Sequence, residues 1–213
     1  MIRAIIFDFD GVLVESVQIK TEAFREMFRA EGAVVEAAVV AYHEVNAGVP
    51  RLKKFQKIYS EILHKPISEN ELSGLCSKFE KLVKMKVIAA PYVRGAKEFV
   101  QRNKDKYAFF VASAAPQKEI QEIIYVRGMG MWFTAIYGFP TSKQEAIRHV
   151  MNDYGLTRSE LVFVGDARAD LETASSTGLR FVARLREGGE DFKDVPVLKI
   201  KDITSLENAI QGF

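Results

Sequence analysis

Residues 5–14 read IIFDFDGVLV, an apolar run that ends on two aspartates and a glycine. In an extended chain, residues i and i+2 point to the same side, so Asp8 and Asp10 present their carboxylates together while Phe9 turns toward the core. Two anions this close repel each other, and a hard cation with oxygen ligands, such as Mg²⁺, would relieve the repulsion. The alternative is an exposed turn in which the aspartates cap backbone N–H groups and Gly11 supplies a positive φ.

The composition is that of a globular chain with one sizeable core and room for a smaller satellite domain. The chain has 213 residues, of which 48% are hydrophobic, and a formal net charge of +2. So small a charge does not favour nucleic acid as a partner. No apolar run approaches the roughly 18 to 20 residues of a membrane span, and the two aspartates interrupt the N-terminal apolar stretch, so neither a membrane partner nor a signal peptide is expected. Cys76 is the only cysteine, which excludes an intrachain disulfide and favours the cytoplasm.

Short apolar, β-rich runs recur along the chain, and helical patterns separate the later ones. The runs are residues 2–7, 107–112, 133–137, 161–164 and 181–185. Near-continuous apolar strands that alternate with amphipathic helices are typical of a parallel sheet covered on both faces. We therefore predict an α/β fold with a Rossmann-like, doubly wound parallel sheet. Gly188 and Gly189, after the last run, are expected to form a turn.

The stretch between the first and second predicted strands is far longer than the single helix that a crossover requires. It holds helical patterns at residues 17–31, 34–46, 50–63 and 68–87, with Pro50 and Ser68 well placed to start helices. This predicts a four-helix bundle inserted into the sheet as a cap domain. We expect the cap to span residues 16–90 and the core to comprise residues 1–15 and 91–213.

Other residues with chemical potential follow the predicted strands, at the edge where an open α/β sheet binds its ligand. Ser113 follows the second strand, and Asp166 follows the fourth with Asp170 one helical turn further on. Lys143 lies in the first turn of a helix that residues 142–145 begin with a capping box. A cation is unfavourable at this end of a helix, so Lys143 indicates an anionic partner. Each residue alone fits a helix cap or a solvated charge, but the combination favours a site.

As a set, these residues resemble the motifs of the haloacid dehalogenase superfamily. They are, in the expected order, DFDGVL at residues 8–13, Ser113 after an apolar strand, Lys143 at a helix start and GDARAD at residues 165–170. The resemblance covers the whole chain, and the inserted helices are similar to the phosphoglycolate phosphatase and β-phosphoglucomutase branch. Glu15 stands where Asp is commoner, and Gln144 where Pro is frequent, which affects hinge and helix-start details only.

The resemblance implies a Mg²⁺-dependent phosphatase for a small anionic phosphorylated metabolite. Asp8 would be the nucleophile that forms an aspartyl phosphate, and Asp10 the general acid and base. Mg²⁺ would be held by Asp8, the Asp10 carbonyl and Asp166, with Asp170 as a further ligand or as support. Phosphate would be held by Ser113, by Lys143, which also offsets the Asp8 charge, and by backbone N–H groups near Gly11 and Ala114.

Residues 48–57 read GVPRLKKFQK, a basic run without an acidic residue. The run fits a solvated helix face. The Gly-x-x-Arg pattern, however, resembles the cap loop of β-phosphoglucomutases, which implies that Arg51 grips an anionic group at the far end of the substrate. Lys54 is a second candidate for substrate specificity. Lys53 and Lys54 are also candidates, by location alone, for the imine-forming lysine of a phosphonate-cleaving relative.

Two other functions are consistent with some of these residues. A β-phosphoglucomutase-like mutase would return the phosphoryl group to a sugar. A regulatory domain phosphorylated on Asp also combines an acidic pocket with a Lys, but it has its phosphoacceptor on a later strand and lacks the insertion. The chain could act as a monomer or a homodimer. Its histidines, His43, His64 and His149, have no metal-ligand spacing and are expected to be at the surface or partly buried.

Overall fold

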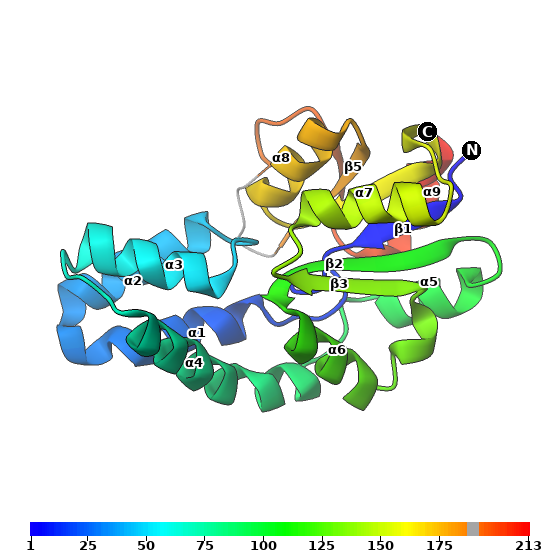
Figure 1. Cartoon of the computed structure of the whole chain (residues 1–213). Helices are drawn as coiled ribbons and strands as arrows, with labels where there is room; N and C mark the ends of the chain where they lie inside the picture. The colour runs from blue at the N-terminus through cyan, green and yellow to red at the C-terminus, as the bar shows by residue number, and fades with distance from the viewer. Residues whose placement is uncertain (187–191) are drawn as a thin grey trace.

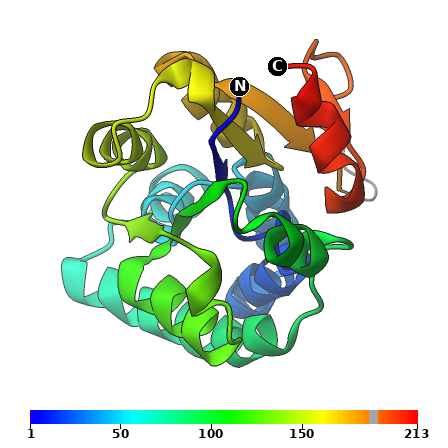
Figure 2. The same cartoon turned by 90° about the vertical axis from the view of Figure 1, so that its right-hand side faces the viewer.

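The structure is a computed structural model that describes residues 1–186 and 192–213. In this part of the chain, six parallel strands form one sheet in the order β3-β2-β1-β4-β5-β6. The strands are β1 (Ala4–Phe7), β2 (Ala108–Pro116), β3 (Ala135–Phe139), β4 (Leu161–Gly165), β5 (Arg180–Arg184) and β6 (Leu198–Ile200). Helices cover both faces of the sheet (Figure 1, Figure 2), which confirms the predicted doubly wound α/β fold.

The two faces of the sheet bury separate apolar clusters, because alternate residues of β1 point to opposite sides. Ile5 and Phe7 pack with α5 (Ala96–Asn103), α6 (Gln117–Val126) and α9 (Leu206–Gln211). Ala4 and Ile6 pack with α7 (Lys143–Asp153) and α8 (Arg168–Thr177). All four residues of β1 are buried, so a strand at the centre of the sheet is apolar without alternation.

The segment between β1 and α5 is helical, as predicted. It contains α1 (Val17–Phe28), α2 (Ala33–Val45), α3 (Arg51–Lys57) and α4 (Glu69–Ala89), with a 3-10 turn at Arg29–Glu31 and a π-helical turn at Ile58–Ile62. Pro50 precedes α3, and Ser68 caps α4 in a capping box with Glu71, so both predicted helix starts are confirmed. Rings of Phe24, Phe28, Phe55 and Phe79 form an aromatic centre among these helices.

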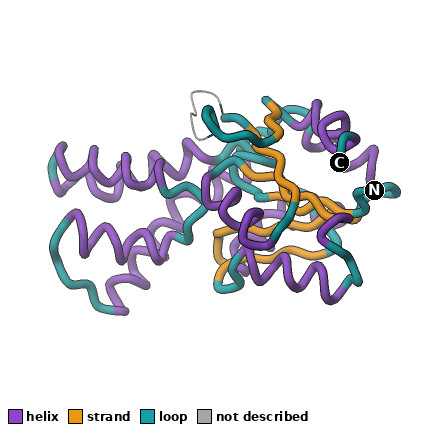
Figure 3. Tube along the Cα trace, turned by 90° about the horizontal axis from the view of Figure 1, so that it is seen from above, coloured by secondary structure: helices purple, strands orange, loops and turns teal. Residues whose placement is uncertain are grey.

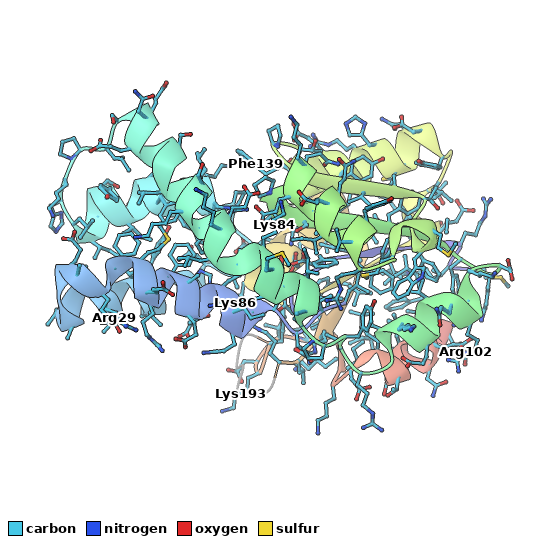
Figure 4. All side chains as sticks on the ribbon, turned by 90° about the horizontal axis from the view of Figure 1, so that it is seen from below. Arg29, Lys84, Lys86, Arg102, Phe139 and Lys193 are labelled. Carbon is cyan, nitrogen blue, oxygen red and sulfur yellow. The ribbon has the colours of Figure 1, made fainter. Side chains whose placement is uncertain are left out.

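The inserted helices extend to one side of the sheet (Figure 1, Figure 3). The last inserted helix, α4, reaches the core and packs beside α6 (Figure 4). At this contact Lys84 Nζ donates a 2.5 Å hydrogen bond to Glu122 Oε2. That the segment is a separate cap domain with limits at residues 16 and 90 stays a prediction.

The observed strands differ from the predicted ones at several ends; β1, for example, begins at Ala4 rather than at residue 2. β2 runs four residues beyond Ala112, so Ser113 lies inside the strand, where the register with β3 is irregular. β3 begins and ends two residues later than expected. β6 was not predicted, because it has only three residues and two of them are exposed. The turn expected at Gly188 and Gly189 lies outside the described residues. Among the helices of the described part, none combines the length and the apolarity that a membrane span needs.

Candidate active site

Three buried aspartates meet at the carboxyl ends of the two central strands. Asp8 follows β1, Asp166 follows β4, and Asp170 lies in the first turn of α8. Because β1 and β4 are paired in the sheet, residues that follow them come together. One carboxylate oxygen from each of the three lies within 4.8 Å of the others. This grouping brings residues from positions 8 to 170 into one acidic centre.

Lys143 joins two of these carboxylates. It is the first residue of α7, which Ser142 and Glu145 begin with the predicted capping box. Its Nζ donates hydrogen bonds to Asp8 Oδ2 at 2.7 Å and to Asp170 Oδ1 at 2.5 Å. Burial alone would lower the pKa of Lys143, but the Asp170 and Asp8 carboxylates outweigh it and raise that pKa above its ordinary value. Lys143 is therefore charged, and its anionic partners are these two aspartates.

The ionisation of Asp8 and Asp166 reflects the crowding of negative charge. Burial raises the pKa of Asp8, and the Lys143 ammonium opposes this shift. The resulting pKa of Asp8 is about 6. Burial and the Asp8 charge raise the pKa of Asp166 well above its ordinary value. The Oδ2 atom of Asp166 is buried and makes no hydrogen bond, while Arg186 Nε lies 3.3 Å away as an ion-pair partner. A buried carboxylate oxygen without a hydrogen bond, among other carboxylates, fits the ligand set of a hard divalent cation.

Gly11 leaves the room that this centre needs. Its φ is +76°, and a Cβ at this position would collide with the Asp166 carboxylate. The Gly11 N–H donates a 2.8 Å hydrogen bond to Val14 O, so this donor already has a partner within the turn. Glycine is thus required both by the backbone conformation and by the close approach of Asp166.

Asp10 faces a different set of partners from Asp8. Its Oδ1 accepts a 2.6 Å hydrogen bond from Ser16 Oγ, and its Oδ2 is paired with Lys20 Nζ. Its carboxylate is outside the group formed by the other three aspartates. Burial would raise the pKa of Asp10, but the charge and hydrogen bond of Lys20 and the Ser16 hydroxyl outweigh it and lower that pKa. Lys20 belongs to none of the motifs quoted above, although Ser16 and Lys20 are four residues apart at the start of α1 and so share one helix face.

The predicted phosphate-binding residues lie beside the aspartates. Ser113 is buried, and its Oγ accepts a 3.1 Å hydrogen bond from Ala115 N. Because the hydroxyl acts as an acceptor in this contact, its O–H can still donate a hydrogen bond to an anion. Ala114 and Ala115 line a cavity together with Asp8. The irregular end of β2 therefore presents a hydroxyl and a short stretch of backbone to the acidic centre.

The cavity lies between the sheet edge and the inserted helices. The inserted segment contributes most of its wall: Val17, Lys20, Phe24, His43, Ala47, Gly48, Val49, Arg51, Lys54 and Phe79. The loop before α3 lies beside the acidic centre, since a Cβ at Gly48 would lie 3.7 Å from Lys143 Nζ. A ligand bound at the aspartates would therefore touch both the core and the inserted helices.

The two predicted specificity residues both line this cavity, in different environments. Arg51 is buried in an ion pair with Glu119 of α6, and its guanidinium carbon lies 5.0 Å from the centre of the Phe79 ring. Its guanidinium thus already has an anionic partner from the protein. Lys54 Nζ lies 3.0 Å from His43 Nδ1.

His43 corrects a sequence-based expectation. It was expected at the surface or partly buried, but it is buried, because its ring stacks on Phe24 with 4.4 Å between the ring centres and contacts the Lys54 ammonium. A signal was present in the sequence: Val39 lies four residues before His43 and is also buried, so the histidine shares an apolar helix face.

Comparisons with known proteins extend these observations. The family model for haloacid dehalogenase-like hydrolases matches residues 5–184. A phosphoglycolate phosphatase from Pseudomonas fluorescens is 24% identical over 96% of this chain and 78% of that protein. The structure of a β-phosphoglucomutase from Clostridium difficile is 18% identical in sequence and superposes with a TM-score of 0.81. The match covers 100% of this chain and 96% of the mutase chain.

A predicted phosphatase from Clostridium acetobutylicum has a TM-score of 0.79 at 18% identity, with 100% of both chains covered. At these identities the solved structures establish the fold. The family match confirms the superfamily that the motifs resemble. The chain belongs to the haloacid dehalogenase-like hydrolase family.

Proposed function

We propose that the protein is a Mg²⁺-dependent phosphatase that hydrolyses a small phosphomonoester through an aspartyl phosphate on Asp8. The observation that carries this proposal is the hydrogen bond from Lys143 to Asp8 within the group of three buried aspartates. Phosphate monoesters resist uncatalysed hydrolysis, so a catalyst needs a fixed nucleophile and compensation of charge. Asp8 and its neighbours provide both.

Asp8 is well held for attack on phosphorus. Its Oδ1 accepts a 2.6 Å hydrogen bond from Phe9 N, and its Oδ2 accepts one from Lys143. In the first step an Asp8 oxygen forms a bond to phosphorus while the bond from phosphorus to the leaving oxygen breaks. In the second step water attacks the aspartyl phosphate and releases inorganic phosphate with Asp8 restored. Lys143 offsets the negative charge that gathers on the phosphoryl oxygens in both steps.

Asp10 is the proposed acid and base. It would give a proton to the leaving oxygen in the first step and take a proton from the attacking water in the second. The partners of its carboxylate, Ser16 and Lys20, favour the ionised form. They keep Asp10 ionised, as the second step requires at its start, and they disfavour the protonated form that the first step requires. Movement of Asp10 away from Lys20 would be needed before it protonates the leaving group.

The acidic centre fits Mg²⁺, with Asp8, Asp166 and the Asp10 carbonyl as ligands and Asp170 as a further ligand or support. The buried Asp166 Oδ2, which has no hydrogen bond, supports this assignment. When bound, the ion would supply Lewis-acid stabilisation of the phosphoryl oxygens. Asp170 also accepts backbone hydrogen bonds from Asp166 and Ala167 through its Oδ2, so it orients the loop after β4 whether or not it is a ligand.

The remaining parts of the site bind and shield the phosphate. Ser113 and the backbone near Gly11 and Ala114 would hold the phosphoryl oxygens. Residues 16–90 would act as a cap that closes over residues 1–15 and 91–213 and excludes water. The substrate would be a small phosphorylated metabolite, as the name of the Pseudomonas relative suggests. We place the protein in the cytoplasm, as a monomer or a homodimer.

A turnover assay tests this function. The purified protein is incubated with phosphoglycolate, sugar phosphates and p-nitrophenyl phosphate, with Mg²⁺ or with EDTA. The proposal predicts release of inorganic phosphate over many turnovers with Mg²⁺ and none with EDTA. Isomerised sugar phosphate without free phosphate would instead identify a mutase. A single long-lived aspartyl phosphate would identify a regulatory domain.

A further inference from the structure

The cavity beside Asp8 contains three cations from the inserted helices, and two of them are neutralised by carboxylates. Lys20 is paired with Asp10, and Arg51 is paired with Glu119. The third, Lys54, differs from both. Within residues 1–186 and 192–213, the polar atoms in contact with its Nζ are His43 Nδ1 at 3.0 Å and His43 O at 3.5 Å. Lys54 thus contributes a positive charge to the cavity wall without a carboxylate beside it.

The surroundings of Lys54 make this charge costly. The residue is 3% exposed, and a buried ammonium is destabilised unless an anion accompanies it. Burial, together with the positive charges of Lys20, Arg186 and Lys143, lowers the pKa of Lys54 to about 7, and the Asp10 carboxylate opposes this shift. Lys54 also lines the same cavity as Asp8 and Ala114, which belong to the proposed phosphate site. A second anion in the cavity would stabilise the charged form of Lys54.

His43 fixes the direction of the Lys54 side chain. Its ring is held against Phe24, and burial together with the Lys54 charge lowers the pKa of His43 to about 2, so the ring is neutral. A charged lysine only donates hydrogen bonds, so Nδ1 accepts and the ring proton is on Nε2. An ammonium that donates to His43 Nδ1 and, at 3.5 Å, to His43 O keeps its third donor for a ligand.

We propose that Lys54, positioned by His43, binds an anionic group on the part of the substrate that does not react. This inference rests on the proposed phosphatase function and narrows its substrates to phosphomonoesters with a second negative group. It gives Lys54 the role that the Gly-x-x-Arg pattern assigned to Arg51, because the Arg51 guanidinium is already paired with Glu119. A carboxylate and a second phosphate share the chemistry that Lys54 recognises.

Matched substrates separate these two groups. The values of kcat/KM are measured for ethyl phosphate, which has no second anion, for 2-phosphoglycolate, which has a carboxylate, and for ethylene glycol bisphosphate, which has a second phosphate. The wild-type protein is expected to prefer one or both substrates with a second anion over ethyl phosphate. In Lys54→Met this preference should fall about tenfold to hundredfold, as for the loss of one hydrogen bond between charged groups. Lys54→Arg keeps the charge and should retain part of the preference.

The neighbouring lysine is the matched control. Lys53 is exposed on the same helix, so Lys53→Met should leave the preference unchanged. Circular dichroism and thermal unfolding of each variant show that it is folded, and Met resembles Lys in length and suits a buried position. An equal loss of kcat/KM for all three substrates in Lys54→Met, with Lys54→Arg no better, would overturn the proposal.

A binding measurement separates this inference from the proposed function. Calorimetry gives the affinities of 2-phosphoglycolate, ethylene glycol bisphosphate and ethyl phosphate for Asp8→Asn protein, with and without Lys54→Met. If no ester is hydrolysed by the wild type but a preference for a second anion depends on Lys54, the function fails and the subsite stands. If esters are hydrolysed but binding shows no preference that depends on Lys54, the subsite fails and the function stands.

Discussion

Arg51 of α3 and Glu119 of α6 form a buried ion pair that joins the inserted helices to the core. The two residues are 68 positions apart in the sequence, and their side chains are 8% and 3% exposed. Arg51 also donates a 3.4 Å hydrogen bond to Cys76 O in α4. Charges buried this deeply depend on each other, because neither can regain its hydration when the partner is removed.

Removing one partner of this pair should destabilise the protein more than replacing both partners by apolar side chains. Arg51→Met leaves the Glu119 carboxylate buried without a partner and should lower the free energy of unfolding by about 3–5 kcal/mol. The double variant Arg51→Met/Glu119→Met replaces both charges by apolar side chains and should recover most of that loss. Urea unfolding of the two single variants and the double variant measures the coupling. Losses that simply add would mean that the two side chains do not depend on each other.

Lys143 should be needed for turnover through its charge. Lys143→Met removes the ammonium from Asp8 and Asp170, so attack on a phosphate would bring an uncompensated carboxylate toward negative oxygens. The loss of one such stabilising group costs about 10²- to 10³-fold in kcat. Release of inorganic phosphate with Mg²⁺ measures it. Lys118→Met, on the exposed side of α6, is the control and should keep wild-type turnover. Unchanged kcat in Lys143→Met would exclude the proposed role.

Gly11 offers a test of the close approach between the turn after β1 and Asp166. Gly11→Ala should reduce both stability and turnover, because its Cβ would displace the Asp166 carboxylate. Gly128 is the matched control: its φ is +69° and nothing lies within 4 Å of an added Cβ. Gly128→Ala should cost only the backbone strain, about 1–2 kcal/mol, and leave turnover intact. Similar effects of both substitutions on turnover would show that the Asp166 contact is unimportant.

The buried Lys54 should leave a signature in the pH dependence of stability. Its pKa is lowered from 10.5 to about 7 in the folded protein. Between these two pH values the unfolded chain binds more protons at Lys54 than the folded one, so the contribution of Lys54 to the free energy of unfolding rises with pH. Lys54→Met lacks this term, so its stability relative to the wild type should be highest below pH 7 and decline toward pH 10.5.

Urea unfolding at a series of pH values measures this difference, with Lys53→Met as the exposed control. A difference between Lys54→Met and the wild type that does not change with pH would show that Lys54 keeps its ordinary pKa in the folded protein.

The sequence was sufficient to predict the strands and helix starts whose conformation depends on neighbouring residues in the chain. β1 and β4 are continuous apolar runs because they lie at the centre of the sheet, and the start of α7 follows from its capping box. The short edge strand β6 has no such signal. Its residues Leu198 and Lys199 are exposed, and it owes its conformation to pairing with β5 rather than to its own pattern.

The acidic centre was predictable in composition, but the contacts of its residues were not. Asp8, Asp166 and Asp170 could be placed together because strand ends in a parallel sheet meet at one edge. The pairing of Arg51 with Glu119 depends on how α3 approaches α6, and no local pattern encodes the packing of helices from distant parts of the chain. Arg186, the ion-pair partner of Asp166, follows β5 and lies outside the four motifs.

The proposed function depends on Asp8 as the nucleophile, and the variant Asp8→Asn removes that nucleophile. The amide has nearly the shape of the carboxylate, and Lys143 keeps its hydrogen bond to Asp170, so the variant should fold. The measurement is the steady-state release of inorganic phosphate from phosphoglycolate and p-nitrophenyl phosphate with Mg²⁺, alongside circular dichroism of both proteins. We predict many turnovers for the wild type and none for the folded Asp8→Asn variant. Wild-type turnover by that variant would contradict the account.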